Sequence, residues 1–238
     1  MFDDFTDYLG GSSGSMQGLR TDILPQPLEA LVEKAPIISV ACGLGHALFL
    51  LANGKVCAWG NGGNGRLGLG DTTDRAEACL IKDLVGEVIG SVQCGASHSM
   101  AITKKNGNVY IWGKNSQGQC GKGNLEDIQR PSFNATLQSE TVVKMAAGWE
   151  HTIALTSNGL LYAWGSGYKD SRRGLVPPVL GLGHAEGRSL PELVVSIKDI
   201  RIIDIASGWD HCLALDSKNR VYSWGSGQNG KERCIAFS

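Results

Sequence analysis

The sequence predicts an all-β fold of short strands in repeated units, and three observations lead to this expectation. Glycine makes up 33 of the 238 residues, well above its usual share of about 7%. With 7 prolines and 42% hydrophobic residues, that excess indicates a folded chain with many tight turns rather than a linker. A pattern of histidine and tryptophan recurs four times in one register. Asn-Gly pairs, which strongly favour β-hairpins, separate the apolar stretches within these repeats.

The repeat combines a Gly-x-x-His stretch with a later Trp-Gly pair. Successive histidines are 52, 53 and 60 residues apart, and each is followed by its tryptophan after 13 or 14 residues. These structural repeat positions are His46, His98, His151 and His211, with Trp59, Trp112, Trp164 and Trp224. Four units in one register predict a repeat architecture in which every unit supplies the same structural element.

Each unit has the same order of predicted strands and turns along the chain. In the first, residues 46–51 alternate small and apolar side chains, which is typical of a strand. Asn53-Gly54 predicts a turn and residues 55–60 a return strand, followed by a glycine-rich bend at 60–71. A further apolar stretch, such as 87–95, precedes the next Gly-x-x-His and supplies another strand or two. About four strands per 50 residues, without an amphipathic helix, predict a β-propeller blade.

These residues resemble the regulator of chromosome condensation (RCC-type) repeat family, whose members form seven-bladed propellers. The resemblance covers roughly residues 22–238. The bend motif of that family is matched by 66–71 and 114–124, and its proline-containing stretch by 24–31, 129–137 and 190–194. The resemblance implies a rigid disc that binds other proteins, and it is less specific for function than for fold.

The chain is expected to hold an incomplete propeller, with about three full repeats plus two half-repeats. Counted from the Val-Tyr-x-Trp-Gly strand, the full repeats run about 54–106, 107–158 and 159–218, with half-repeats at 22–51 and 219–238. The half-repeats either pair as one composite blade, or the ring is completed by a longer parent or a second copy. Open edges of an incomplete ring invite association. Residues 1–21, acidic and rich in glycine and serine, are expected to be a flexible N-terminus.

Two regions are candidates for partner binding. The third unit carries about eight extra residues, which predict a surface loop, and function on repeat scaffolds concentrates in loops. Tyr and Arg are also frequent at binding hot spots. A second candidate is the pair of tryptophans that follow glycine in the third and fourth Gly-x-x-His stretches. The candidate partner-binding residues are therefore Tyr168, Lys169, Asp170, Arg172, Arg173, Trp149 and Trp209.

Several apparent chemical motifs are better explained by the repeat. The four histidines occur once per unit at one phase, which predicts that each is buried, hydrogen-bonds the backbone inside its own blade and binds no metal. Glu150-His151 and Asp210-His211 are neighbours on a strand, so their side chains are expected to point to opposite faces. The G-x-G-x-x-G pattern at 60–65 lacks the following helix that a nucleotide site needs. The odd count of seven cysteines, without a signal peptide, favours a reducing compartment, and the lack of C-x-x-C argues against a metal site or a disulfide framework. We therefore expect no enzyme, no metal and no cofactor.

The function expected is a non-catalytic protein–protein interaction scaffold, embedded in a larger ubiquitin ligase or signalling protein. The alternative that the resemblance implies is a guanine-nucleotide exchange factor for a Ran- or Rab-like small GTPase. Attachment to chromatin is disfavoured, because 22 basic and 23 acidic residues nearly cancel and the N-terminus is acidic. The sequence lacks an apolar run long enough for a membrane span and a signal peptide, so the cytoplasm or nucleus is the expected location, with other proteins as partners.

Overall fold

The computed structural model describes residues 35–166 and 179–225, which form four antiparallel sheets. The first sheet contains β1 (Ile37–Cys42), β2 (His46–Leu51), β3 (Val56–Gly60) and β4 (Arg75–Leu80). The second contains β5 (Ile89–Cys94), β6 (His98–Thr103), β7 (Val109–Gly113) and β8 (Ile128–Phe133). The third contains β9 (Val142–Ala147), β10 (His151–Thr156), β11 (Leu161–Gly165) and β12 (Arg188–Leu193). The fourth contains β13 (Ile202–Ser207), β14 (His211–Asp216) and β15 (Val221–Gly225).

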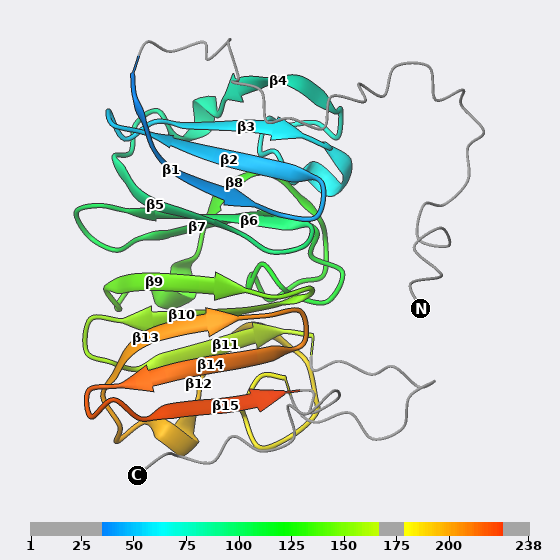
Figure 1. Cartoon of the computed structure of the whole chain (residues 1–238). Coiled ribbons are helices and arrows are strands. Elements are labelled where there is room, and N and C mark those ends of the chain that lie inside the picture. Colours follow the sequence, from blue (N-terminus) through cyan, green and yellow to red (C-terminus); the bar gives the residue numbers. More distant parts are fainter. Residues whose placement is uncertain (1–34, 167–178, 226–238) are drawn as a thin grey trace, which may run out of the picture.

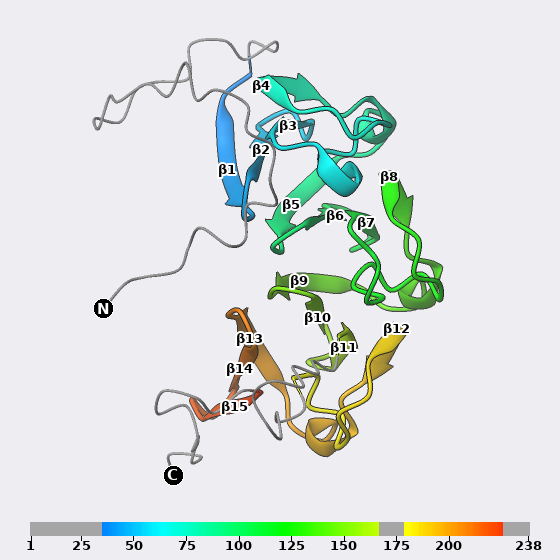
Figure 2. The ribbon, with the colours of Figure 1, turned by 90° about the vertical axis from the view of Figure 1, so that its right-hand side faces the viewer.

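The sheets stand side by side in an open arc, as the blades of part of a propeller (Figures 1 and 2). The first strand of each blade, β1, β5, β9 or β13, lies on the inner side of the arc, and successive inner strands contact one another. Each chain segment then runs outward through neighbouring antiparallel strands. The expected all-β, incomplete propeller is therefore confirmed.

The core lies between neighbouring blades. The second strand of each of the first three blades is buried along its whole length, because it has a strand on either side and apolar neighbours on its faces. Leu48 and Leu50 of β2, for example, pack in one cluster with Val92, Ala101 and Trp112 of the second blade. Equivalent clusters join the second blade to the third and the third to the fourth. Burial thus fixes each blade against the next.

The Asn-Gly turns differ in detail from the two-residue turns that the sequence suggests. Gly54, Gly107 and Gly159 have positive φ values of 80°, 67° and 83°, but the asparagines before them do not. Each turn is longer, with one residue in the left-handed conformation, where glycine has no steric penalty. In the fourth blade Asn219 takes that place with φ of 62°, which asparagine tolerates better than most residues.

The blades are offset from the sequence repeats. The first half-repeat supplies β1 and β2, which pair with β3 of the following repeat, and β15 of the last half-repeat pairs with β14. The alternative of a composite blade built from the two half-repeats is therefore wrong for these strands, because each half-repeat pairs with its neighbour along the chain. The described residues form three four-stranded blades and one three-stranded blade. The expected flexible segment 1–21 lies outside the described residues.

Candidate protein-binding face

The Gly-x-x-His loops at one end of the inner strands are shaped by contact between glycine and histidine. An ideal Cβ placed on Gly95 would lie 2.1 Å from Cε1 of His98, and the same atom on the other three glycines would lie 2.1–2.2 Å from Cε1 of their histidines. No side chain fits at that distance. The glycine is therefore required for close approach of the imidazole ring, and it folds each loop tightly over its own histidine.

The other side of each imidazole joins two blades. Nε2 of His46 lies 2.8 Å from Oγ of Ser99, Nε2 of His98 lies 2.9 Å from Oγ1 of Thr152, and Nε2 of His151 lies 2.7 Å from Oγ of Ser207. In every pair the hydroxyl belongs to the following blade. The expectation that each histidine bonds backbone inside its own blade is therefore wrong: the side chain reaches across the blade boundary, where a small hydroxyl residue leaves space for the ring.

Proton positions and burial make these histidines structural groups. Ser99 donates its hydroxyl proton to the Arg66 carbonyl at 2.7 Å, so Nε2 of His46 is the donor in the His46–Ser99 bond. Loss of hydration on burial lowers the pKa of His98 to about 3 and those of His46 and His151 to about 4. The rings are neutral near pH 7. A general base must instead accept a proton from its nucleophile, so the His46–Ser99 pair lacks the arrangement of a catalytic dyad.

The repeated tryptophans lock the glycine-rich bends onto the next blade. Nε1 of Trp112 donates to the carbonyl of Arg66 at 3.0 Å, and Nε1 of Trp164 donates to the carbonyl of Gln119 at 2.9 Å. Both tryptophans are fully buried, and each acceptor lies in the bend of the preceding blade. Trp59 in the first blade instead donates to Ala76 of its own blade at 2.8 Å and is 37% exposed. The described part of the chain holds no earlier bend for Trp59.

The tips of the Gly-x-x-His loops form one continuous arc. The backbone N–H of Leu44 donates to the Ala96 carbonyl at 3.0 Å, that of Ala96 to Gly148 at 3.2 Å, and that of Trp149 to Trp209 at 3.0 Å. These bonds hold four residues of the same repeat phase in fixed order on one face. The two tryptophans were expected here from the sequence, but Leu44 and Ala96 were not, although they share the same repeat phase.

Trp149 and Trp209 stack on one another on this face. Their ring centroids are 3.8 Å apart and their planes differ by 8°. Trp209 keeps 52% of its surface exposed although its ring lies flat against a neighbour. A large exposed aromatic surface on a rigid backbone is typical of a protein-binding hot spot, because little conformational entropy is lost when a partner covers it.

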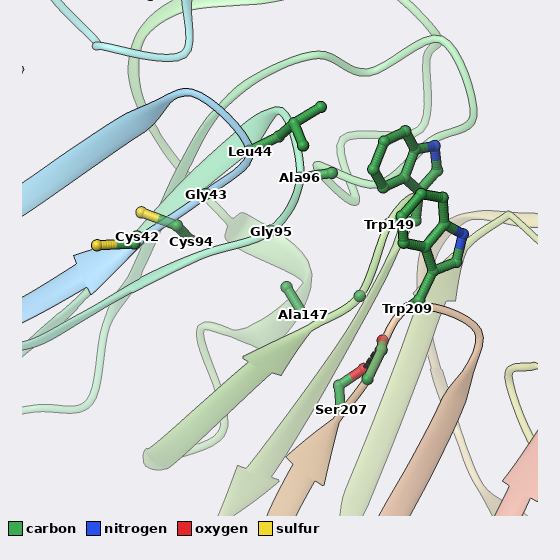
Figure 3. Close-up of a pocket in the computed structure, with 12 residues that line it drawn as sticks. Cys42, Gly43, Leu44, Cys94, Gly95, Ala96, Ala147, Trp149, Ser207 and Trp209 are labelled. Carbon is green, nitrogen blue, oxygen red and sulfur yellow. Dashed lines mark hydrogen bonds between the residues drawn. The ribbon is translucent and has the colours of Figure 1, made fainter. Parts of the chain in front are cut away.

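The stacked pair borders a shallow hollow of about 340 Å³ at the inner side of the arc (Figure 3). The tip residues of all four loops contribute to its lining, together with the last residues of the four inner strands. The lining residues are Cys42, Gly43, Leu44, Cys94, Gly95, Ala96, Ala147, Gly148, Trp149, Ser207, Gly208 and Trp209. The surface is mostly apolar and most of its residues have small side chains, so the two tryptophans are its largest side chains.

Two acidic residues follow the tryptophans, and the structure corrects how they were expected to lie. Glu150 forms an ion pair of 2.6 Å with Lys114 and is only 17% exposed, so it is held by a neighbouring blade. Oδ1 of Asp210 lies 3.5 Å from Nδ1 of His211. The expectation that neighbours point apart fails for Asp210 and His211, because Asp210 belongs to the bend before β14 and not to the strand. Glu150 and Asp210 directly follow Trp149 and Trp209 in the chain.

The remaining predicted positions add no chemistry to this face. Tyr168, Lys169, Asp170, Arg172 and Arg173 lie outside the described residues. Within 35–166 and 179–225, no group of three His, Cys, Asp or Glu side chains is placed to hold a metal ion. No helix in the same ranges is long and apolar enough to span a membrane.

Comparison with known proteins identifies relatives of the whole repeat region. A family model described as an RCC1-like domain matches residues 8–232. The chain is 36% identical over 192 residues to human E3 ubiquitin-protein ligase HERC2, covering 80% of this chain and 4% of that protein. It is 34% identical over 209 residues to the ultraviolet-B receptor UVR8 of Arabidopsis thaliana, covering 88% and 45%. Human RCC2 is 31% identical over 216 residues, with 82% and 40% covered.

Solved structures give the same fold. Prp20p of Saccharomyces cerevisiae, a structure reported together with its binding to Gsp1p and histones, has a TM-score of 0.67 and 26% identity, covering 84% of this chain and 48% of that one. Human WBSCR16, at 23% identity and a TM-score of 0.69, supports the fold alone. The chain spans less than half the length of the curated relatives given above.

Proposed function

Because the chain belongs to the RCC1-like domain family, we propose that it is a non-catalytic protein-binding module that contacts its partner through the face carrying Trp149 and Trp209. The observation that carries this proposal is the stacked pair itself: two large aromatic rings on one rigid loop arc, one of them half exposed. Within a larger protein the module would recruit a partner for an activity located elsewhere in that protein. Its relationship to the ligase HERC2 supports this role.

The geometry favours binding over catalysis. The Ser99 hydroxyl donates its proton to a backbone carbonyl and accepts a hydrogen bond from His46, so His46 does not act as a base towards Ser99. The histidine rings between the blades are also buried. The surface near the tryptophans consists mostly of apolar loop tips, and the residues that directly follow the tryptophans, Glu150 and Asp210, are acidic. A partner segment with an apolar side chain for the hollow and a basic side chain beside it fits that chemistry.

The test compares the loss of an exposed apolar side chain on this face with the loss of one elsewhere on the surface. Trp209→Ala removes the exposed ring, and Val195→Ala removes an apolar side chain that is 60% exposed in the short helix after β12. With partners first identified by proximity labelling of the intact chain, we expect at least about tenfold weaker binding for Trp209→Ala, equivalent to about 1.4 kcal/mol, and unchanged binding for Val195→Ala. Equal effects of the two variants, or full binding by Trp209→Ala, would contradict the proposal.

The second candidate is guanine-nucleotide exchange on a small GTPase. The likeness to yeast Prp20p, whose structure was reported with its binding to Gsp1p, supports testing it. Release of a fluorescent guanine nucleotide from a panel of small GTPases separates the two functions. We expect no acceleration by this chain. Acceleration that Trp209→Ala abolishes would replace the scaffold proposal with the exchange reaction.

The loop of the third unit is tested in the same binding assay. Changing Tyr168, Arg172 and Arg173 to Ala is expected to weaken partner binding. Unchanged binding by a folded triple variant would exclude this loop and leave the tryptophan face as the contact site.

A further inference from the structure

Two cysteines occupy the same position in neighbouring blades, directly before the Gly-x-x-His loops. Cys42 ends β1 and Cys94 ends β5, and the corresponding residues of the third and fourth blades are Ala147 and Ser207. The position therefore accepts a methyl or a hydroxyl group in the same structural setting, and packing does not require sulfur. Thiols occur only in the two blades that are adjacent to each other.

The backbones that follow these cysteines are in contact. The Leu44 N–H donates to the Ala96 carbonyl at 3.0 Å, and an ideal Cβ on Gly43 would lie 2.5 Å from the Gly95 carbonyl oxygen. Both cysteines line the hollow, and Figure 3 shows their side chains lying together at one end of it. The two thiols are near enough to interact electrostatically. A disulfide needs Cα atoms about 4.4–6.8 Å apart, and the contacts between the residues that directly follow the two cysteines bring these strand ends close together.

The two thiols differ in environment in a way that assigns their roles. Cys42 is exposed, so an oxidant reaches it first. Cys94 is partly buried, and desolvation raises its pKa to about 12. Of the six described cysteines, which are all free thiols, Cys57, Cys120 and Cys212 are buried and Cys79 lies on β4 at the outer side of its blade. The Cys42–Cys94 pair is thus the accessible one in which both thiols line a single hollow.

We propose that Cys42 and Cys94 are a modification site, at which hydrogen peroxide converts the two thiols to a disulfide that joins the inner strands of the first and second blades. Cys42 attacks one peroxide oxygen, which breaks the O–O bond and gives a sulfenic acid and one water. Cys94 then attacks the sulfenic sulfur, the S–O bond breaks, and the hydroxyl leaves as a second water with the thiol proton. Two thiols are oxidised and one peroxide is reduced to two waters.

The bond would act on the binding face. Its sulfurs lie in the lining of the same hollow as Trp149 and Trp209, and it would fix β1 to β5 covalently at the loop arc. A cross-link that closes the loop between residues 42 and 94 also restricts the unfolded chain, so the oxidised form is expected to have the higher Tm.

The experiment uses the full chain, first reduced and then exposed to limited hydrogen peroxide, with free thiols blocked before digestion with trypsin. Cleavage after Lys34, Lys55, Lys82 and Lys104 places each cysteine in its own peptide, 35–55 and 83–104. We expect a linked pair of these two peptides that disappears on reduction. Titratable thiols in denaturant should fall from seven to five. Oxidation of Cys42 without the linked pair, or linkage to any other cysteine in its place, would overturn the proposal.

Matched controls come from the chain itself. Cys42→Ala and Cys94→Ser introduce the residues that stand at the same position in the third and fourth blades, so both variants are expected to fold. After the same treatment Cys42→Ala should retain six thiols, Cys94→Ser should lose at most the Cys42 thiol to sulfenic acid, and neither variant should show a rise in Tm. Loss of two thiols from either variant would show that other cysteines react, and would refute the assignment of this pair.

Discussion

Replacement of Thr152 by Val tests whether the hydrogen bonds between blades hold the propeller together. Thr152 is fully buried near the start of β10 in the third blade, and its hydroxyl makes two bonds of 2.9 Å. It accepts from Nε2 of His98 in the second blade and donates to the carbonyl of Gln119. Valine has nearly the same shape but no hydroxyl, so the substitution removes both bonds while it preserves packing.

The expected loss of stability depends on which hydrogen bonds the two former partners of Thr152 retain. The Gln119 carbonyl retains the Trp164 indole N–H at 2.9 Å, so it stays paired. Nε2 of His98, on a ring with no exposed surface, loses its acceptor from Thr152. One buried donor without a partner costs about 1–3 kcal/mol, and we expect the free energy of unfolding to fall by that amount.

Ser207→Ala is the matched control. It removes the corresponding hydroxyl at the next blade boundary, but Nε2 of His151 keeps Sγ of Cys212 at 3.2 Å, so the loss should stay below about 1 kcal/mol. Both variants are measured by urea denaturation at pH 7, followed by circular dichroism. The reasoning is refuted if Thr152→Val destabilises no more than Ser207→Ala.

Three further predictions use the same contacts. Gly95→Ala should lower the free energy of unfolding by about 1–3 kcal/mol, since its Cβ would lie 2.1 Å from His98. The control Gly86→Ala, with open space around its Cβ, should change the Tm little. Similar Tm values for the two variants would contradict this prediction. Trp112→Phe should lower the free energy of unfolding by about 2 kcal/mol or more, and Trp59→Phe should lower it less, because Trp112 is fully buried and Trp59 is not. A lower urea midpoint for Trp59→Phe than for Trp112→Phe would contradict this prediction. The free energy of unfolding should fall as the pH drops from about 6.5 towards 4. The three buried histidines have folded pKa values of about 3 to 4, below the unfolded value of about 6.5. Between these values the unfolded state therefore binds more protons than the folded state. A Tm constant from pH 7 to 4.5 would disprove it.

The repeated strands could be predicted from sequence because their signals are local. The histidine-led strands were expected at 46–51 in the first unit and at the same phase in the others, and the structure has β2, β6, β10 and β14 there. Alternation along each strand and the glycine after each turn depend only on neighbouring residues. The number of units then fixed how much of a ring the chain can form.

The contacts between units could not be predicted in the same way. Within one repeat, Ser99 and Thr152 look like small residues next to a histidine, and nothing local shows that their hydroxyls serve the histidine of the preceding blade. Trp149 and Trp209 are 60 residues apart, so their stacking depends on the spacing of two blades. Asp210 was misjudged because a strand was extended by one residue into a bend.

The histidine and tryptophan contacts at the blade boundaries are repeated in one order. His46, His98 and His151 each meet a hydroxyl in the following blade, and the bends of the first two blades are bonded to Trp112 and Trp164 of the following blade. The first blade accordingly carries Ala47 where its successors carry Ser99, Thr152 and Cys212. Because a chain is synthesised from its N-terminus, each of these histidines is made before the residue that carries its hydroxyl partner. The buried side chains of one blade thus depend on the blade that follows it in the sequence.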